Sequence, residues 1–136
     1  EPPWIVRMAE WRKITRAEAD PEFHEALVDI GRAFGTMGLG LGMRSHIEIE
    51  RFVANGSEIM KDPADAFDFA LLQRVIPKIR GFKGDLEEGL YELSEILKDE
   101  DAEHCLEVIA HWLDPAMSED QYLDGTNTRT GLWSPD

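Results

Sequence analysis

Hydrophobic residues recur at helical spacing along most of the chain. After Asp20-Pro21, four apolar side chains follow 4-3-4 spacing, which places them on one face of a helix; they are Phe23, Leu27, Ile30 and Phe34. Proline suits the first turn of this helix, because its missing N–H has no intrahelical partner there. A glycine-rich stretch at 35–42 ends the helix. The pattern therefore predicts a first amphipathic helix that begins at Pro21.

A second helix is predicted from Ser45 to Asn55-Gly56. Ser45 is an acceptable N-cap, and Glu48 stands three residues later, which completes a capping box. The apolar face contains Ile49, Phe52 and Val53. Glycine after asparagine is a common helix end, so Asn55-Gly56 terminates this element.

The broadest apolar surface follows Asp62-Pro63. One stripe contains Ala66, Phe69, Leu72, Ile76 and Ile79, and it is widened by Phe67, Leu71 and Val75. A surface this wide predicts a central, well-buried helix. Pro77 should kink it or end its regular part, because proline removes one backbone hydrogen bond and clashes with the preceding turn.

Two further helices complete the predicted fold. Asp85 caps the fourth, whose apolar stripe is Leu86, Leu90, Leu93 and Leu97; the fifth covers about residues 101–114 and has Leu106, Ile109, Trp112 and Leu113. The sequence thus predicts an all-α protein, a compact bundle of about five helices with an irregular C-terminal tail.

The expected organisation has three parts. Residues 1–20 are a lead-in from a preceding domain, in which the apolar "WIV" is the tail of a strand; no other strand is predicted. Residues 21–117 are the helical bundle, and 118–136 are a polar tail. Four apolar residues of the tail are candidates to pack back on the bundle: Tyr122, Leu123, Leu132 and Trp133. Because the chain begins with Glu1, we expect it to be a piece of a longer protein.

Composition narrows the functional classes. The chain carries 28 acidic and 14 basic residues, a net charge of −14. This balance argues against direct nucleic-acid binding and against docking on anionic membranes, since both need clustered Lys and Arg. A single cysteine excludes an internal disulfide and fits a reducing, cytoplasmic compartment. No apolar run is long enough to span a membrane.

The stretch "GTMGLGLGMRS" at 35–45 allows three interpretations. A phosphate-binding loop of Walker type needs a lysine after its last glycine and a strand before the loop, and both are missing. A flexible interhelical loop explains the glycines but not Arg44, which is electrostatically unfavourable at a helix N-terminus. A nearby anion would resolve this, because helix N–H groups and a guanidinium bind it together.

Other candidate sites have simpler explanations. His104, Glu107 and His111 share a helix face, but a metal site would need a further ligand, and Cys105 points about 100° away from His104. His24 and His46 stand alone in the sequence, as surface or partly packed histidines. We therefore predict no metal site.

Two further sets of polar residues are candidates for a function. The many carboxylates of 85–104 lie opposite the leucine stripe and form a solvated face, and Cys105 is predicted to be inert. Lys78, Arg80 and Lys83 form the one dense basic patch, which would contact an acidic partner surface or, less favourably, nucleic acid.

Two motifs carry a resemblance to a known family. "LGMRSHIEIERFVANG", followed after a short linker by "AFDFALLQRVIPKIRG", resembles the C-terminal helical lid of AAA+ ATPases of the McrB-like branch, found in modified-cytosine-dependent restriction systems. Gly42-Met43-Arg44 matches the G-x-R element, and Ala70–Gly81 matches the second signature, with Arg74 where Lys is common and Ile76 where Leu is common. The Trp4–Trp11 lead-in is similar to the passage from the last core strand. The resemblance covers about residues 1–100.

The resemblance implies a role for Arg44 as the sensor-2 arginine, which reaches the terminal phosphates of a nucleotide. Gly40, Gly42 and Ser45 would lie near ATP or GTP with Mg²⁺ in the full-length protein. The implied partners are an N-terminal AAA+ core domain and further copies in a ring-shaped homo-oligomer. The chain lacks Walker A and Walker B sequences, so it would not hydrolyse nucleotide alone.

Two other hypotheses stay open at this point. One is a free-standing, acidic, all-α module that binds a partner protein through an exposed helix face. The other is a small metal-binding helical protein that uses His104, Glu107 and His111.

Overall fold

The protein is described by a computed structural model over residues 21–56 and 62–127. Its five α-helices within these ranges are α2 (Pro21–Thr36), α3 (Met43–Gly56), α4 (Pro63–Arg74), α5 (Lys83–Asp99) and α6 (Glu103–Trp112). The fold is completed by two short 3₁₀ turns, η1 (Ile76–Lys78) and η2 (Gly125–Asn127), and by two strands, β1 (Arg80–Phe82) and β2 (Tyr122–Asp124). The all-α prediction is confirmed. The lead-in at 1–20, with its "WIV" strand, and the Leu132-Trp133 pair lie outside the described residues.

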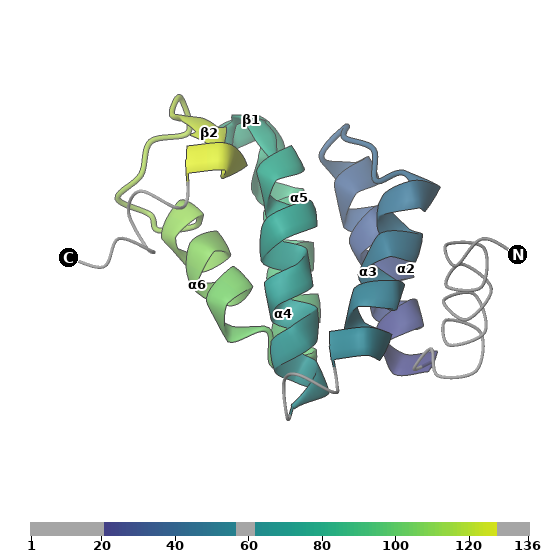
Figure 1. The fold of residues 1–136 in the computed structure, drawn as a ribbon. Coiled ribbons are helices and arrows are strands. Elements are labelled where there is room, and N and C mark those ends of the chain that lie inside the picture. The colour runs from purple at the N-terminus through teal and green to yellow at the C-terminus, as the bar shows by residue number, and fades with distance from the viewer. Residues whose placement is uncertain (1–20, 57–61, 128–136) are drawn as a thin grey trace, which may run out of the picture.

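The helices form one bundle around a shared apolar core. Figure 1 shows α2 and α3 next to each other on one side, α4 and α5 in the middle and α6 on the other side. Helix α5 packs against α2 and α6, and helix α4 packs against α3 and α6. The two strands lie together at one end of the bundle, near the start of α5 (Figure 1).

Two of the predicted apolar stripes are buried as expected. On α2, the 4-3-4 residues are at most 8% exposed; on α5, the four leucines are at most 2% exposed. Phe23 of α2 packs on Phe67 of α4 with ring centroids 4.6 Å apart. Burial of large apolar side chains is the main favourable term in folding, so these stripes account for the position of α5 at the centre.

Helix α4 begins as predicted but turns a different face to the core. The Asp62 carboxylate accepts a hydrogen bond from the Ala64 N–H at 2.9 Å, and Pro63 occupies the first turn. Phe69, predicted to be in the buried stripe, is 39% exposed and stacks on Phe52 of α3 with centroids 5.6 Å apart. The α-helix ends at Arg74 and the chain continues through η1, so no single stripe extends from residue 66 to residue 79. Pro77 does end the regular helix, as predicted.

Helix α3 begins earlier than predicted. Its first residue is Met43, and the His46 N–H donates to the Gly42 carbonyl at 3.2 Å. Ser45 therefore lies inside the first turn, where its hydroxyl accepts from the Lys78 ammonium. The capping box at Ser45 and Glu48 is wrong, because the glycine before Met43 already supplies the non-helical entry to α3.

The two strands were not predicted. Three residues of β1 pair with three of β2 in antiparallel register, with Gly81 opposite Leu123. Leu123 is 2% exposed, so it packs back on the bundle as predicted. The next residue but one, Gly125, donates its N–H to the Ile79 carbonyl at 2.9 Å, and a Cβ there would lie 1.7 Å from the Ile76 carbonyl oxygen. Glycine at 125 is thus required by close backbone approach.

Candidate functional site

The glycine-rich loop between α2 and α3 first ends a helix. The Leu39 N–H donates to the Phe34 carbonyl at 2.8 Å, and the Gly38 N–H donates to the Gly35 carbonyl at 3.0 Å. Gly38 has a φ of 74°, in the left-handed region that favours glycine. Together these are the bonds of a Schellman motif, in which Leu39 adds an apolar contact to the core. The fold itself therefore explains Gly38.

Gly40 and Gly42 are different from Gly38. Neither has a φ in the left-handed region, and a Cβ added at either would meet nothing within 4 Å. The described part of the chain therefore places no steric or conformational demand for glycine at these two positions. The backbone here is open to close approach from outside the bundle.

Arg44 follows directly and points into solvent. Its side chain is 92% exposed, and its Nε lies 3.3 Å from a carboxylate oxygen of Glu48, one turn along α3. The other Glu48 oxygen accepts from Nη1 of Arg74 on α4 at 2.6 Å. Lys78 reaches Ser45 from η1. Arg44 and Arg74 thus share the Glu48 carboxylate, and Lys78 contacts the neighbouring Ser45, at the N-terminal end of α3 where the helix dipole adds positive potential.

The basic patch predicted at Lys78, Arg80 and Lys83 does not exist as one surface. Lys83 is 2% exposed, and its ammonium donates to the carbonyls of Asp114 and Met117 at 2.7 and 2.8 Å. Arg80 lies 3.7 Å from Asp124 across the strand pair. Lys78 instead lies near the start of α3, where its ammonium contacts the Ser45 hydroxyl. The prediction of this patch was wrong because one of its members holds the loop after α6.

The histidines on α6 do not come together as a ligand set. The His104 ring Nδ1 is 2.8 Å from a carboxylate oxygen of Asp68 on α4, and the same oxygen accepts from the His104 N–H. Within 21–56 and 62–127, one group of His, Cys, Asp and Glu side chains has a geometry suited to a metal, and it is elsewhere. The metal hypothesis built on His104, Glu107 and His111 gains no support.

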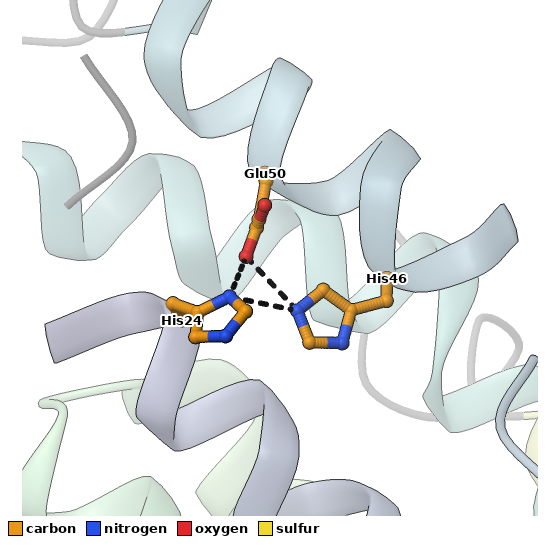
Figure 2. A group of neighbouring side chains, drawn as sticks. All are labelled: His24, His46 and Glu50. Carbon is orange, nitrogen blue, oxygen red and sulfur yellow. Dashed lines mark hydrogen bonds and ion pairs between the residues drawn. The ribbon is translucent and has the colours of Figure 1, made fainter. Parts of the chain in front are cut away.

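That group is formed by His24 of α2 with His46 and Glu50 of α3. Figure 2 shows the two rings and the carboxylate turned toward a common point. One Glu50 oxygen lies 2.5 Å from His24 Nδ1 and 2.9 Å from His46 Nε2, and the two nitrogens are 3.3 Å apart. The sequence offered one clue, the i, i+4 spacing of His46 and Glu50. The two histidines are 22 residues apart, so no local pattern in the sequence indicates that His24 joins this pair.

The surroundings of Cys105 disfavour a nucleophilic thiolate. It is buried, and its thiol donates to the Asp68 carbonyl at 3.3 Å. Burial, followed by the nearby Asp68 charge, raises the pKa of the Cys105 thiol far above its ordinary value. The thiol thus stays protonated at neutral pH, in line with the prediction that this residue is inert.

The described residues form a bundle of five helices, with Arg44 at the start of α3 and a cluster of two histidines and one glutamate between α2 and α3. The chain belongs to the family described as a domain of unknown function, DUF8727, which matches residues 5–122. No curated protein and no solved structure matches it. Among the helices that the structure describes, none combines the length and apolar character needed to cross a bilayer.

Proposed function

We propose that this chain is a helical lid-like domain that presents Arg44 to the phosphates of a nucleotide bound by an AAA+ NTPase domain. The observation that carries the proposal is the exposed Arg44 guanidinium at the start of α3. The positive guanidinium is repelled by the positive N-terminal end of the helix dipole. A phosphate bound at this position would be attracted by both groups and would offset their repulsion.

The neighbours of Arg44 support an anionic ligand. Arg74 and Lys78 come from a different part of the chain and converge on the same helix start, where Glu48 neutralises one of the three cations. The Arg44–Glu48 pair is largely exposed, and such pairs contribute about 0–1 kcal/mol. A phosphate can therefore replace Glu48 as the partner of the Arg44 guanidinium at a small cost in free energy.

The open glycines support the same role. Gly40 and Gly42 are not required by the fold of the described residues, so a ligand or neighbouring domain that approaches the backbone gives them a purpose. Ser45 offers a hydroxyl on the same turn. Bound ATP or GTP with Mg²⁺ would supply the phosphoryl group, and this chain would supply positive charge beside it. The main nucleotide surface would lie on the AAA+ core, in a ring of identical subunits. A restriction system in the cytoplasm is the setting that the motif resemblance suggests.

The test compares two arginines in the polypeptide or complex that joins this domain to its NTPase partner, read from the gene and its neighbours. Arg44→Ala should lower kcat for ATP or GTP hydrolysis by at least about tenfold, while the thermal midpoint stays unchanged. Arg32→Ala is the matched control, since Arg32 is also exposed and also pairs within its own helix, with Asp29. Equal turnover of the two variants, or the absence of any NTPase domain in the gene or its complex, would contradict the proposal.

A second candidate function is an acidic protein-interaction module. Phe82 and Tyr122 are each about half exposed and form an edge-to-face pair with centroids 5.3 Å apart. Phe82 also lines a shallow pocket with Asp85, Glu119 and Asp120. An aromatic ring beside carboxylates suits a Lys- or Arg-rich segment. Phe82→Ala should abolish binding to such a peptide, and Tyr91→Ala, at a separate exposed aromatic, should not.

A further inference from the structure

The His24–His46–Glu50 cluster is partly preorganised. His46 and Glu50 side chains are 17% and 14% exposed and lie one helical turn apart on α3, whereas the His24 side chain is 56% exposed. The side chains of His46 and Glu50 thus have restricted conformational freedom, and the His24 side chain contacts them from α2. Ordering that precedes binding reduces the entropy cost of capturing a ligand.

The three donor atoms lie within 4.8 Å of one another, and one of their separations matches that of a metal site. Tetrahedral zinc with bonds of about 2.0–2.1 Å has ligand atoms separated by roughly 3.3 Å. His24 Nδ1 and His46 Nε2 are 3.3 Å apart. The Glu50 oxygen is closer to both nitrogens, at 2.5 and 2.9 Å, so metal binding requires the carboxylate to move away from both rings.

The donor chemistry points to a transition metal. Two imidazole nitrogens and one carboxylate oxygen form a set that binds zinc and other first-row divalent ions, whereas calcium and magnesium prefer oxygen donors alone. We propose that His24, His46 and Glu50 bind one divalent transition-metal ion, with Zn²⁺ as the reference ion. Three protein ligands would leave a fourth position, which the exposure of His24 makes accessible to water.

The arrangement suits a cation better than a set of shared protons. Without a metal, the three mutual contacts among these atoms have at most two ring protons to share, so at least one pair of atoms faces each other without a hydrogen bond, whichever tautomers the rings adopt. A cation at the common point uses a lone pair from each of the three atoms. It also joins α2 to α3, so that binding should stabilise the fold.

The experiment is a calorimetric titration of the chelator-treated 136-residue chain with ZnCl₂. The wild type should bind one equivalent, and bound zinc should raise the thermal midpoint. His24→Gln and Glu50→Gln should each weaken binding by roughly tenfold or more, because each removes one ligand. His111→Gln is the matched control, since it removes an exposed histidine on α6 and should bind zinc as the wild type does.

A second readout reports the ligands directly. With Co²⁺ in place of Zn²⁺, the wild type should show the visible ligand-field bands of a four-coordinate site, and the Glu50→Gln variant should lose them. Far-UV circular dichroism checks that each variant is folded. The proposal is overturned if the wild type binds neither ion, if the folded His24→Gln and Glu50→Gln variants bind as the wild type does, or if His111→Gln loses binding.

Discussion

The Asp68 carboxylate on α4 accepts a hydrogen bond from the backbone N–H of Cys105 on α6, at 2.9 Å. Its second oxygen accepts from the His104 N–H at 3.0 Å. Asp68 is 3% exposed, and these two N–H groups belong to the first turn of α6, where backbone donors lack intrahelical partners. A side chain from a different helix therefore caps α6.

Loss of this cap should destabilise the whole bundle. Asp68→Ala leaves two N–H groups at the start of α6 without an acceptor, and we expect the free energy of unfolding to fall by about 2–3 kcal/mol. Asp99→Asn, at an exposed aspartate, should change it by less than about 0.5 kcal/mol. Urea denaturation measures both. Equal stabilities of the two variants would show that Asp68 does not act as a cap.

The buried Lys83 ammonium should hold the loop after α6. Lys83→Met keeps a similar side-chain volume but leaves the Asp114 and Met117 carbonyls without this donor. We expect faster amide hydrogen exchange in residues 113–121 and a loss of about 1–3 kcal/mol in stability. Lys98→Met, at an exposed lysine paired with Glu95, serves as the control and should alter neither quantity. Unchanged exchange in the loop would argue against this role.

Substitution of glycine by alanine should change the stability of the protein in opposite directions at two positions. A Cβ at Gly89 of α5 would lie 2.2 Å from the Met37 side chain and 2.8 Å from the Ala33 carbonyl oxygen. Gly89→Ala should therefore force α2 and α5 apart and cost about 1–3 kcal/mol. A Cβ at Gly31, within α2, would meet nothing within 4 Å. Gly31→Ala should stabilise the protein by about 0.5–1 kcal/mol. Thermal denaturation distinguishes the two, and a stabilising Gly89→Ala would contradict the close packing of these helices.

The thiol of Cys105 should make stability depend on alkaline pH. Its pKa in the folded protein is raised above the ordinary value of 9.0, so the unfolded chain loses its proton first. The stabilising contribution is complete below pH 9 and decreases as the pH rises above it, by at most about 1.4 kcal/mol per pH unit. Denaturation between pH 8 and pH 10.5 measures this slope.

Cys105→Ala provides the control for that slope. The variant should lose this part of the pH dependence, whatever its absolute stability. A thiol reagent at pH 8 should react slowly with the native wild type and rapidly in urea. Fast labelling of the native protein would show that the thiol is not protected by burial.

Helical periodicity was enough to locate the five described helices but not all of their faces. The leucines of α5 fall on one stripe, and because the helix is regular throughout, all four are buried. On α4 the same reasoning assigned Phe69 to the core. In the structure, Phe67 and Leu71 are buried, whereas Phe69 lies on the face of α4 that meets Phe52 of α3.

Of the residues at the candidate sites, some could be predicted from local sequence and others could not. Arg44 stood out because a cation at a helix start is a local anomaly. His24 and Glu50 gave no such signal, since their proximity depends on how α2 lies against α3. Lys83 has the sequence context of a surface cation, because the Asp114 and Met117 carbonyls that bind its ammonium are 31 and 34 residues away. The β1–β2 pair escaped because three-residue strands carry too little alternation to detect.

The contact between η2 and η1 has a consequence for synthesis on the ribosome. The backbone around Ile76 and Ile79 is covered by Gly125, one of the last described residues to be translated. Helices α2 to α6 therefore emerge from the exit tunnel before the segment that packs against η1 at one end of the bundle. A ribosome paused shortly after α6 would hold a nascent chain whose helices are present but whose backbone contacts at this end are still incomplete.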